Sequence, residues 1–203
     1  NPRTAILLLN VGTPESSDAS AVRKYLSEFL NDKRVIDIPW FLRKLLVNFI
    51  IVPFRTQKSA KLYKRLWTKK GSPLLIHGLS LKKKLQQKLG EEFIVEFAAN
   101  YQLPNINEIT HKVLKQKVSR IIAFPLFPQY SSSTTGSAIE KLLIILAEQY
   151  NIPAINTILQ YYDNPYYLEA MVSLIGLYNH ENYDHILMSF HGLPLRQVRS
   201  SHH

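Results

Sequence analysis

Cysteine is missing altogether from this 203-residue chain. Its absence excludes disulfide bonds, thiolate-held iron–sulfur clusters and cysteine-based zinc sites, and is compatible with a reducing compartment. Because 46% of the residues are hydrophobic, the chain can still bury a sizeable core. Its length suits one α/β domain, or one domain and part of a second.

Long hydrophobic runs are also missing. The apolar run at residues 5–11 suits a strand buried on both faces of a parallel sheet. It is too short for the core of a signal peptide with its flanks, or for a membrane span. We therefore expect a cytoplasmic protein, either free or associated with a membrane surface.

Acidic residues are absent between Asp37 and Glu91, whereas basic residues are frequent there. These basic residues are Arg43, Lys44, Arg55, Lys58, Lys61, Lys64, Arg65, Lys69, Lys70, Lys82, Lys83, Lys84 and Lys88. They outnumber the net charge of +10, so the rest of the chain is slightly acidic. The segment is either a pair of solvated helices or a surface that faces an anionic partner. No nucleic-acid-binding motif is present, and we expect no nucleic acid partner.

The segment from Trp40 to Phe54 is almost wholly apolar; Pro39 directly precedes it and Pro53 lies near its end. The stretch between these prolines, residues 40–52, is too short to span a bilayer. It predicts either a core helix or a helix in the membrane interface, where the basic residues behind it would contact anionic lipid.

Strands and helices alternate along the rest of the chain, which predicts a doubly wound parallel sheet of Rossmann-like type with helices on both faces. The predicted strands are residues 5–11, 93–99, 120–124, 154–159 and 185–190. The predicted helices after the first strand begin near Ser17 or Asp18, at Arg55, at Pro73 behind Ser72, behind Asn105, near Ser137 and at Pro165.

Three unusual segments follow predicted strands, at the edge where ligands bind in such sheets. They are Gly12 to Pro14, the loop "FPLFPQYSSSTTGS" at residues 124–137, and His191 with Gly192. The loop lacks both glycine-rich nucleotide-binding patterns, and its aromatic residues and prolines suggest a flat apolar ligand with a polar edge. A neutral imidazole at His191 can ligate a divalent metal or accept a proton near neutral pH.

The pair "PLFPQYSSSTTGS" and "SFHGLP" resembles the signature of the ferrochelatase family. The opening "LLLNVGTPES", and "PFRTQKSAKLY" leading to "GSPL", extend the resemblance over essentially the whole chain. It implies two similar doubly wound, chelatase-type domains with a porphyrin cleft between them. The implied reaction is insertion of Fe²⁺, a substrate, into protoporphyrin IX to form protohaem, without a tightly bound cofactor.

The resemblance also implies roles for individual residues. His191 becomes the catalytic residue at the metal and proton site, either as base or as iron ligand. The apolar segment from Trp40 to Phe54 becomes a lip against a membrane. The implied substrate-binding residues are Val11, Arg34, Arg55, Tyr63, Ser72, Tyr130, Ser131, Ser132, Ser133, Thr134 and Thr135.

Members of the family continue well beyond the position of His191, and that further part carries the glutamate partner of the histidine. We therefore expect residues 1–160 to form a complete first domain and residues 161–203 the start of an incomplete second domain. We also expect the chain by itself to be inactive or nearly so.

Other functions remain open from the sequence. One is a chelatase for coproporphyrin, or for a corrin precursor such as sirohydrochlorin, although the apolar lip disfavours the latter. Another is a non-catalytic porphyrin-binding module at the membrane periphery. A generic phosphate-binding α/β domain is disfavoured because the glycine motifs are missing.

Overall fold

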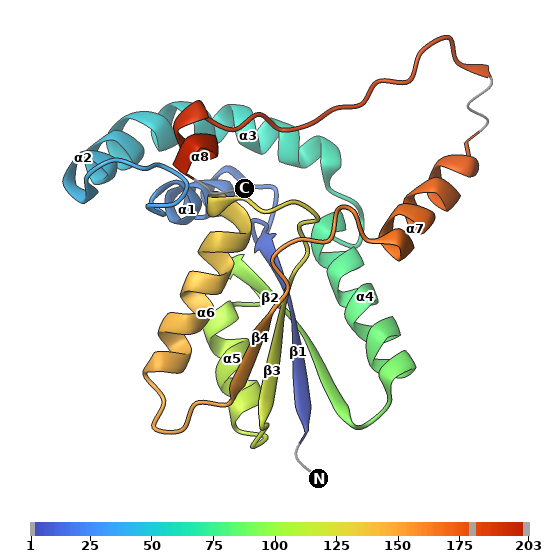
Figure 1. Cartoon of the computed structure of the whole chain (residues 1–203). Helices are drawn as coiled ribbons and strands as arrows, with labels where there is room; N and C mark the ends of the chain where they lie inside the picture. Colours follow the sequence, from blue (N-terminus) through green and yellow to red (C-terminus); the bar gives the residue numbers. More distant parts are fainter. Residues whose placement is uncertain (1–2, 179–181, 201–203) are drawn as a thin grey trace. The chain divides into compact units, whose positions relative to one another are not determined.

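In the computed structural model, which describes residues 3–178 and 182–200, the chain divides into two units, Asn1–Leu159 and Gln160–His203. The larger unit contains the sheet that Figure 1 shows, with the termini of its parallel strands at common edges. The smaller unit contains helices and irregular segments.

The sheet has four parallel strands in the order β2-β1-β3-β4. Their bounds are Thr4–Gly12 for β1, Phe93–Tyr101 for β2, Arg120–Pro125 for β3 and Ala154–Thr157 for β4. The prediction of the first four strands and of the α/β class is confirmed. The most apolar strands, β1 and β2, are almost wholly buried.

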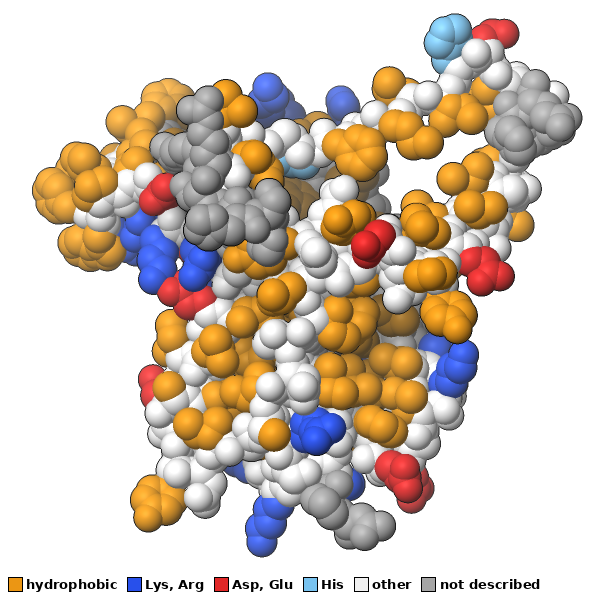
Figure 2. All heavy atoms as spheres, viewed as in Figure 1, with side chains coloured by type: hydrophobic (Ala, Val, Ile, Leu, Met, Phe, Trp, Pro, Cys, Tyr) orange, Lys and Arg blue, Asp and Glu red, His pale blue; other side chains and the backbone are white. Residues whose placement is uncertain are grey.

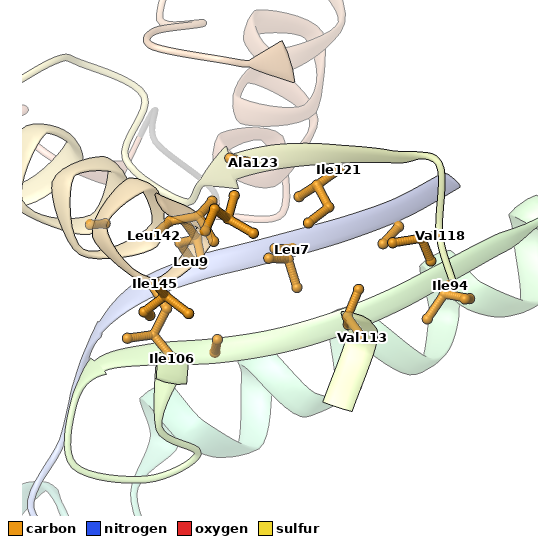
Figure 3. Close-up of a cluster of buried hydrophobic side chains, with 14 residues drawn as sticks. Leu7, Leu9, Ile94, Ile106, Val113, Val118, Ile121, Ala123, Leu142 and Ile145 are labelled. Atoms are coloured by element: carbon orange, nitrogen blue, oxygen red, sulfur yellow. The ribbon is translucent and has the colours of Figure 1, made fainter. Parts of the chain in front are cut away.

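Helices cover both faces of the sheet (Figure 1). α5 (Ile106–Leu114) and α6 (Ser137–Ala147) pack on one face, and α4 (Pro73–Leu89) packs on the other. Figure 3 shows Leu7 and Ile121 of the sheet on the same side as Val113 of α5 and Leu142 of α6. Because helices cover both of its faces, the parallel sheet is doubly wound.

Local sequence sets several helix ends. Asn105 caps α5, since its side-chain oxygen accepts a hydrogen bond of 2.8 Å from the N–H of Asn107. Ser72 precedes α4 as predicted, but its side chain makes no capping bond. Gly90 ends α4 with a φ of 74°, a conformation that glycine adopts readily.

The helix after Trp40 continues through Pro53, so the prediction that a separate helix begins at Arg55 is wrong. α2 (Trp40–Leu45), a π-helical segment η1 (Leu46–Ile51) and α3 (Val52–Leu66) follow one another directly. The N–H of Val52 bonds to the carbonyl of Val47, five residues back. This wider turn accommodates a proline at the start of α3, where a regular helix would need its missing N–H.

The smaller unit contains α7 (Pro165–Gly176), capped by Asn164, and α8 (Leu195–Ser200). The predicted strand at residues 185–190 is wrong, because these residues are exposed and have no regular structure. A strand needs a hydrogen-bonded neighbour. The described residues of this unit contain no other strand with which it could pair.

Replacing Gly78 of α4 by alanine tests how tightly this helix packs on the sheet. A Cβ atom at Gly78 would lie 2.4 Å from the Phe97 ring of β2. We expect Gly78→Ala to lower the free energy of unfolding by about 1–3 kcal/mol because the buried ring must shift. Chemical denaturation followed by circular dichroism measures the change. Ser80→Ala, on the exposed side of the same helix, should have little effect, and equal stabilities of the two variants would contradict the packing.

Candidate functional site

The carboxyl ends of β1, β2 and β3 meet at one edge of the sheet. Gly12, at the end of β1, lies opposite Tyr101 of β2, and Leu9 lies opposite Pro125 of β3. Gly12 has a φ of 98°, and a Cβ atom there would lie 2.0 Å from the carbonyl oxygen of Tyr101. Only glycine allows these two strand ends to approach so closely. The predicted ligand-binding loops after β1 and β3 therefore start side by side.

The hydroxyl-rich loop folds into a π-helical turn, η2 (Ser132–Gly136), that runs directly into α6. The carbonyl of Ser131 accepts hydrogen bonds from the N–H groups of Thr134 and Gly136, at 3.2 and 3.0 Å. The Ser131 and Ser133 hydroxyl oxygens lie 2.9 Å apart, within hydrogen-bond distance. Thr135 is fully buried, and its hydroxyl makes no hydrogen bond with the described residues, whereas the Thr134 hydroxyl donates to the Ser131 carbonyl oxygen at 3.4 Å. Several of the predicted substrate-binding hydroxyls thus stabilise the loop itself.

Arg34 fastens this loop to α6. Its Nη1 donates to the Ser132 hydroxyl oxygen at 3.1 Å, and its Nε donates to Glu140 of α6 at 2.5 Å. Lys33 pairs with the other Glu140 oxygen, also at 2.5 Å. Burial alone would raise the pKa of the Glu140 carboxyl, but these two cations outweigh it and lower the pKa. In this structure Arg34, which we predicted to bind substrate, positions the loop.

Gly136 allows Arg34 and Tyr130 to approach the backbone of the loop. A Cβ atom at Gly136 would lie 3.1 Å from the Tyr130 hydroxyl oxygen and 3.2 Å from Arg34 Nη1. The structure therefore brings together three of the predicted substrate-binding residues, Arg34, Tyr130 and Ser132.

A second polar cluster lies directly behind the loop, around the Asp32 carboxylate. Ser137, the first residue of α6, donates to Asp32 at 2.5 Å, and the Tyr101 hydroxyl donates to the same oxygen at 2.7 Å. The other oxygen accepts the N–H of Arg34 at 2.8 Å. Asn100 also donates to the Ser137 hydroxyl oxygen at 2.9 Å. The cluster joins the end of β2, the start of α6 and the segment after α1 (Ala19–Leu30).

The electrostatics of this cluster favour an ionised Asp32. Burial by itself would raise the pKa of its carboxyl, but the hydrogen bonds from Ser137, the Arg34 N–H and Tyr101 outweigh it. The charge of Lys141 acts in the same direction, so the pKa is held below its usual range. Burial lowers the pKa of Lys141, whose ammonium lies 3.8 Å above the centre of the Tyr101 ring.

An aromatic cluster borders the same edge of the sheet on the α3 side. Val11 and Tyr63, both predicted to bind substrate, pack against a buried group that includes Tyr25 and Tyr101. The Tyr63 ring meets Tyr25 edge-on at 6.2 Å and Trp67 at 6.3 Å. Burial raises the pKa of Tyr63, so its phenol stays a neutral hydrogen-bond donor.

The remaining predicted residues are Arg55, Ser72 and His191, and none of them makes a contact described above. Arg55 is exposed on α3, and Ser72 is buried at the start of α4. His191 belongs to the smaller unit, is exposed, and follows no strand, so the prediction that it ends a strand is wrong. Its Nδ1 lies 2.7 Å from the carbonyl oxygen of Gly192.

The described residues contain no group of three or more histidine, aspartate or glutamate side chains that could hold a metal ion. His191 therefore belongs to no such group within the part of the chain that the structure describes.

A family model described as Ferrochelatase matches residues 3–203. The chain belongs to the ferrochelatase family. Ferrochelatase of Legionella pneumophila (strain Paris) is 45% identical over 199 residues, which cover 98% of this chain and 59% of the relative. Ferrochelatase of Coxiella burnetii (strain Dugway 5J108-111) is 37% identical over 206 residues, which cover 99% of this chain and 56% of the relative. The chain thus spans somewhat more than half the length of these curated relatives.

Family membership confirms the resemblance carried by the two signature motifs, which both fall within the matched residues. The structure adds Asp32, Tyr101 and Ser137, which sequence reasoning missed. Tyr101 could have been predicted from its position, because it ends β2 at the ligand-binding edge of the sheet. We predicted that this strand stops at residue 99, which left Tyr101 in a loop.

Asp32→Asn tests the cluster behind the loop in this member of the ferrochelatase family. Removing a half-buried, hydrogen-bonded charge should lower the free energy of unfolding by about 1–2 kcal/mol near pH 7. The pKa of Asp32 is lower in the folded chain, so its contribution is complete above a pH of about 4. It is lost as the pH falls through the lowered pKa, and the two proteins should converge there.

Urea denaturation at several pH values between about 3 and 7 measures this difference. The matched control is Asp18→Asn, at an exposed carboxyl where asparagine is an equally good helix cap. A difference between Asp32→Asn and the parent that does not change with pH would rule out the ionised carboxylate as its cause.

Proposed function

We propose that this chain carries the first porphyrin-binding domain of an enzyme that inserts Fe²⁺ into protoporphyrin IX. The main support for this proposal is the position of the hydroxyl-rich loop. The loop fastened by Arg34, with Tyr130 at its start, lies at the ligand-binding edge of the sheet in a chain that matches the ferrochelatase family throughout.

The residues at this edge suit a flat apolar ring with carboxylates at its rim. Val11 and the aromatic cluster offer apolar contact, and Tyr63 retains a neutral phenol. The exposed guanidinium of Arg55 can pair with a propionate of the porphyrin. Tyr130, held near the loop backbone at Gly136, offers a further ring for the macrocycle.

Insertion of Fe²⁺ requires that two pyrrole N–H protons leave as the ion sheds water and enters the ring. His191 has an exposed imidazole, which can accept such a proton or bind the borderline Fe²⁺ ion. We propose His191 for one of these tasks. The family resemblance implies a glutamate partner for it, so we expect this 203-residue chain by itself to insert iron slowly or not at all.

Porphyrin binding can be tested apart from chemistry. Trp67 lies 6.3 Å from Tyr63, so quenching of tryptophan fluorescence reports on this region. We expect saturable quenching by protoporphyrin in detergent, and Tyr130→Ala should weaken it roughly three- to tenfold because an aromatic contact is lost. Tyr150→Ala, at a fully exposed tyrosine, is the matched control and should bind as the parent does.

Equal affinities of Tyr130→Ala and Tyr150→Ala would remove the loop from the binding site. A parallel titration with coproporphyrin, which has four propionates instead of two, identifies the preferred substrate. His191→Ala should leave binding unchanged if His191 acts only on the metal or the pyrrole protons.

We further propose that the helices after Trp40 contact a membrane surface. Seven large apolar side chains of this segment are exposed: Trp40, Phe41, Leu42, Leu45, Phe49, Ile50 and Phe54. Figure 2 shows hydrophobic side chains gathered where Figure 1 places α2. No helix among the described residues is both long enough and apolar enough to cross a membrane. An apolar ridge next to exposed lysines suits the interface of a bilayer.

Phe54→Ser tests this contact, since Phe54 is 82% exposed. We expect it to weaken binding to lipid vesicles roughly tenfold because burying a phenylalanine side chain contributes about 1.5–3 kcal/mol. Co-sedimentation with vesicles measures the bound fraction. Leu143→Ser, on the exposed side of α6, should have no effect, and a similar loss in both variants would contradict a specific membrane face.

A further inference from the structure

A cavity of about 640 Å³ lies between α1, α2, α6 and the end of β2. None of the predicted porphyrin-binding residues lines it. Its volume is in the range of small-molecule sites. It is also next to the apolar ridge, because Lys44, one of its lining residues, belongs to α2.

The carboxylates that line the cavity already have partners. Glu140 pairs with Lys33 and Arg34, and Asp32 accepts three hydrogen bonds. Glu28 accepts hydrogen bonds from the backbone N–H and the side-chain amide of Gln102. The negative charges of these carboxylates are therefore already compensated, and they do not favour a bound cation.

Two lysines that line the cavity have no carboxylate partner among the described residues. Lys141 donates to the carbonyl oxygen of Asn100 at 2.8 Å, and no carboxylate lies within ion-pair distance of it. Lys44 is half-buried and makes no hydrogen bond or ion pair with the residues that the structure describes. Burial lowers the pKa of Lys141 by more than the nearby charges of Asp32 and Glu28 raise it, and a bound anion would further stabilise its charged form.

Two acceptors at the cavity also lack a donor. Gln102 is only 6% exposed, has a φ of 63°, and its Oε1 is buried without a hydrogen bond. The Oδ1 of Asn31, which also lines the cavity, is in the same state. A positive φ at a residue other than glycine costs free energy and is frequent at ligand sites. Both oxygens are inaccessible as they stand, and a ligand hydroxyl would supply the missing donor once the amide side chain turns toward the cavity.

We propose that this cavity binds a small phosphate monoester that carries hydroxyl groups, with Lys44 and Lys141 facing the phosphate and Gln102 and Asn31 facing the hydroxyls. A phosphate monoester has a charge close to −2, which matches two ammonium groups. The same chemistry occurs in a soluble sugar or glycerol phosphate and in the headgroup of an anionic lipid. The soluble source is independent of the function proposed above, whereas the lipid source rests on the membrane contact.

The first experiment is a calorimetric titration of the full chain with sn-glycerol 3-phosphate at constant ionic strength. We expect saturable binding that Lys44→Gln weakens roughly fivefold, because one charge contact is lost. Lys58→Gln removes the same charge from an exposed position of α3 and should bind as the parent does. n-Propyl phosphate, which lacks the hydroxyls, should bind more weakly than sn-glycerol 3-phosphate.

The second experiment measures binding of the same variants to phosphatidylglycerol vesicles and to phosphatidylcholine vesicles. If Lys44→Gln weakens binding to phosphatidylglycerol more than Lys58→Gln does, the site takes a lipid headgroup. If the two variants bind these vesicles equally but differ with sn-glycerol 3-phosphate, the ligand is soluble. If they do not differ in either experiment, the proposal is wrong, even where Phe54→Ser still abolishes vesicle binding.

Discussion

The Asp32 carboxylate accepts hydrogen bonds from three segments of the chain, and the arrangement of the ligand-binding edge depends on it. Through Ser137 it holds the start of α6, where the hydroxyl-rich loop ends. Through the Arg34 N–H it orients the residue whose guanidinium holds Ser132. Asp32 is half-buried, and its charge is stabilised by these hydrogen bonds, so the three segments are positioned together. The loop therefore keeps its shape without a ligand.

Changes in helical register occur on both sides of this edge. η1 precedes Pro53, and η2 leads from the hydroxyl loop into α6. A π-helical turn adds a residue to the hydrogen-bonded ring and rotates the side chains that follow. In η1 it lets one helix continue through Pro53 while Phe49 and Phe54 stay exposed. In η2 it directs the carbonyl of Ser131 to the N–H of Gly136.

The loop and the cavity differ in whether their cations are paired with carboxylates. Around the loop, the cations Lys33 and Arg34 are paired with Glu140. At the cavity beside α2, Lys44 and Lys141 have no carboxylate partner within the described residues. Of these four cations, only Lys44 belongs to the basic segment between Asp37 and Glu91. Lys44 adds local positive charge next to the apolar ridge.

Sequence reasoning predicted the parallel sheet, most helix starts and the family, because apolar periodicity, Asn105, Pro165 and the two signature motifs are local features. Tertiary structure decided the rest. A strand at residues 185–190 requires a neighbour that no local pattern supplies, and the continuation through Pro53 depends on a π-helical turn. Likewise, Arg34 holds the loop because Glu140, far away in sequence, packs beside it. Pairing between distant residues depends on the packed fold, and sequence reasoning has no direct access to it.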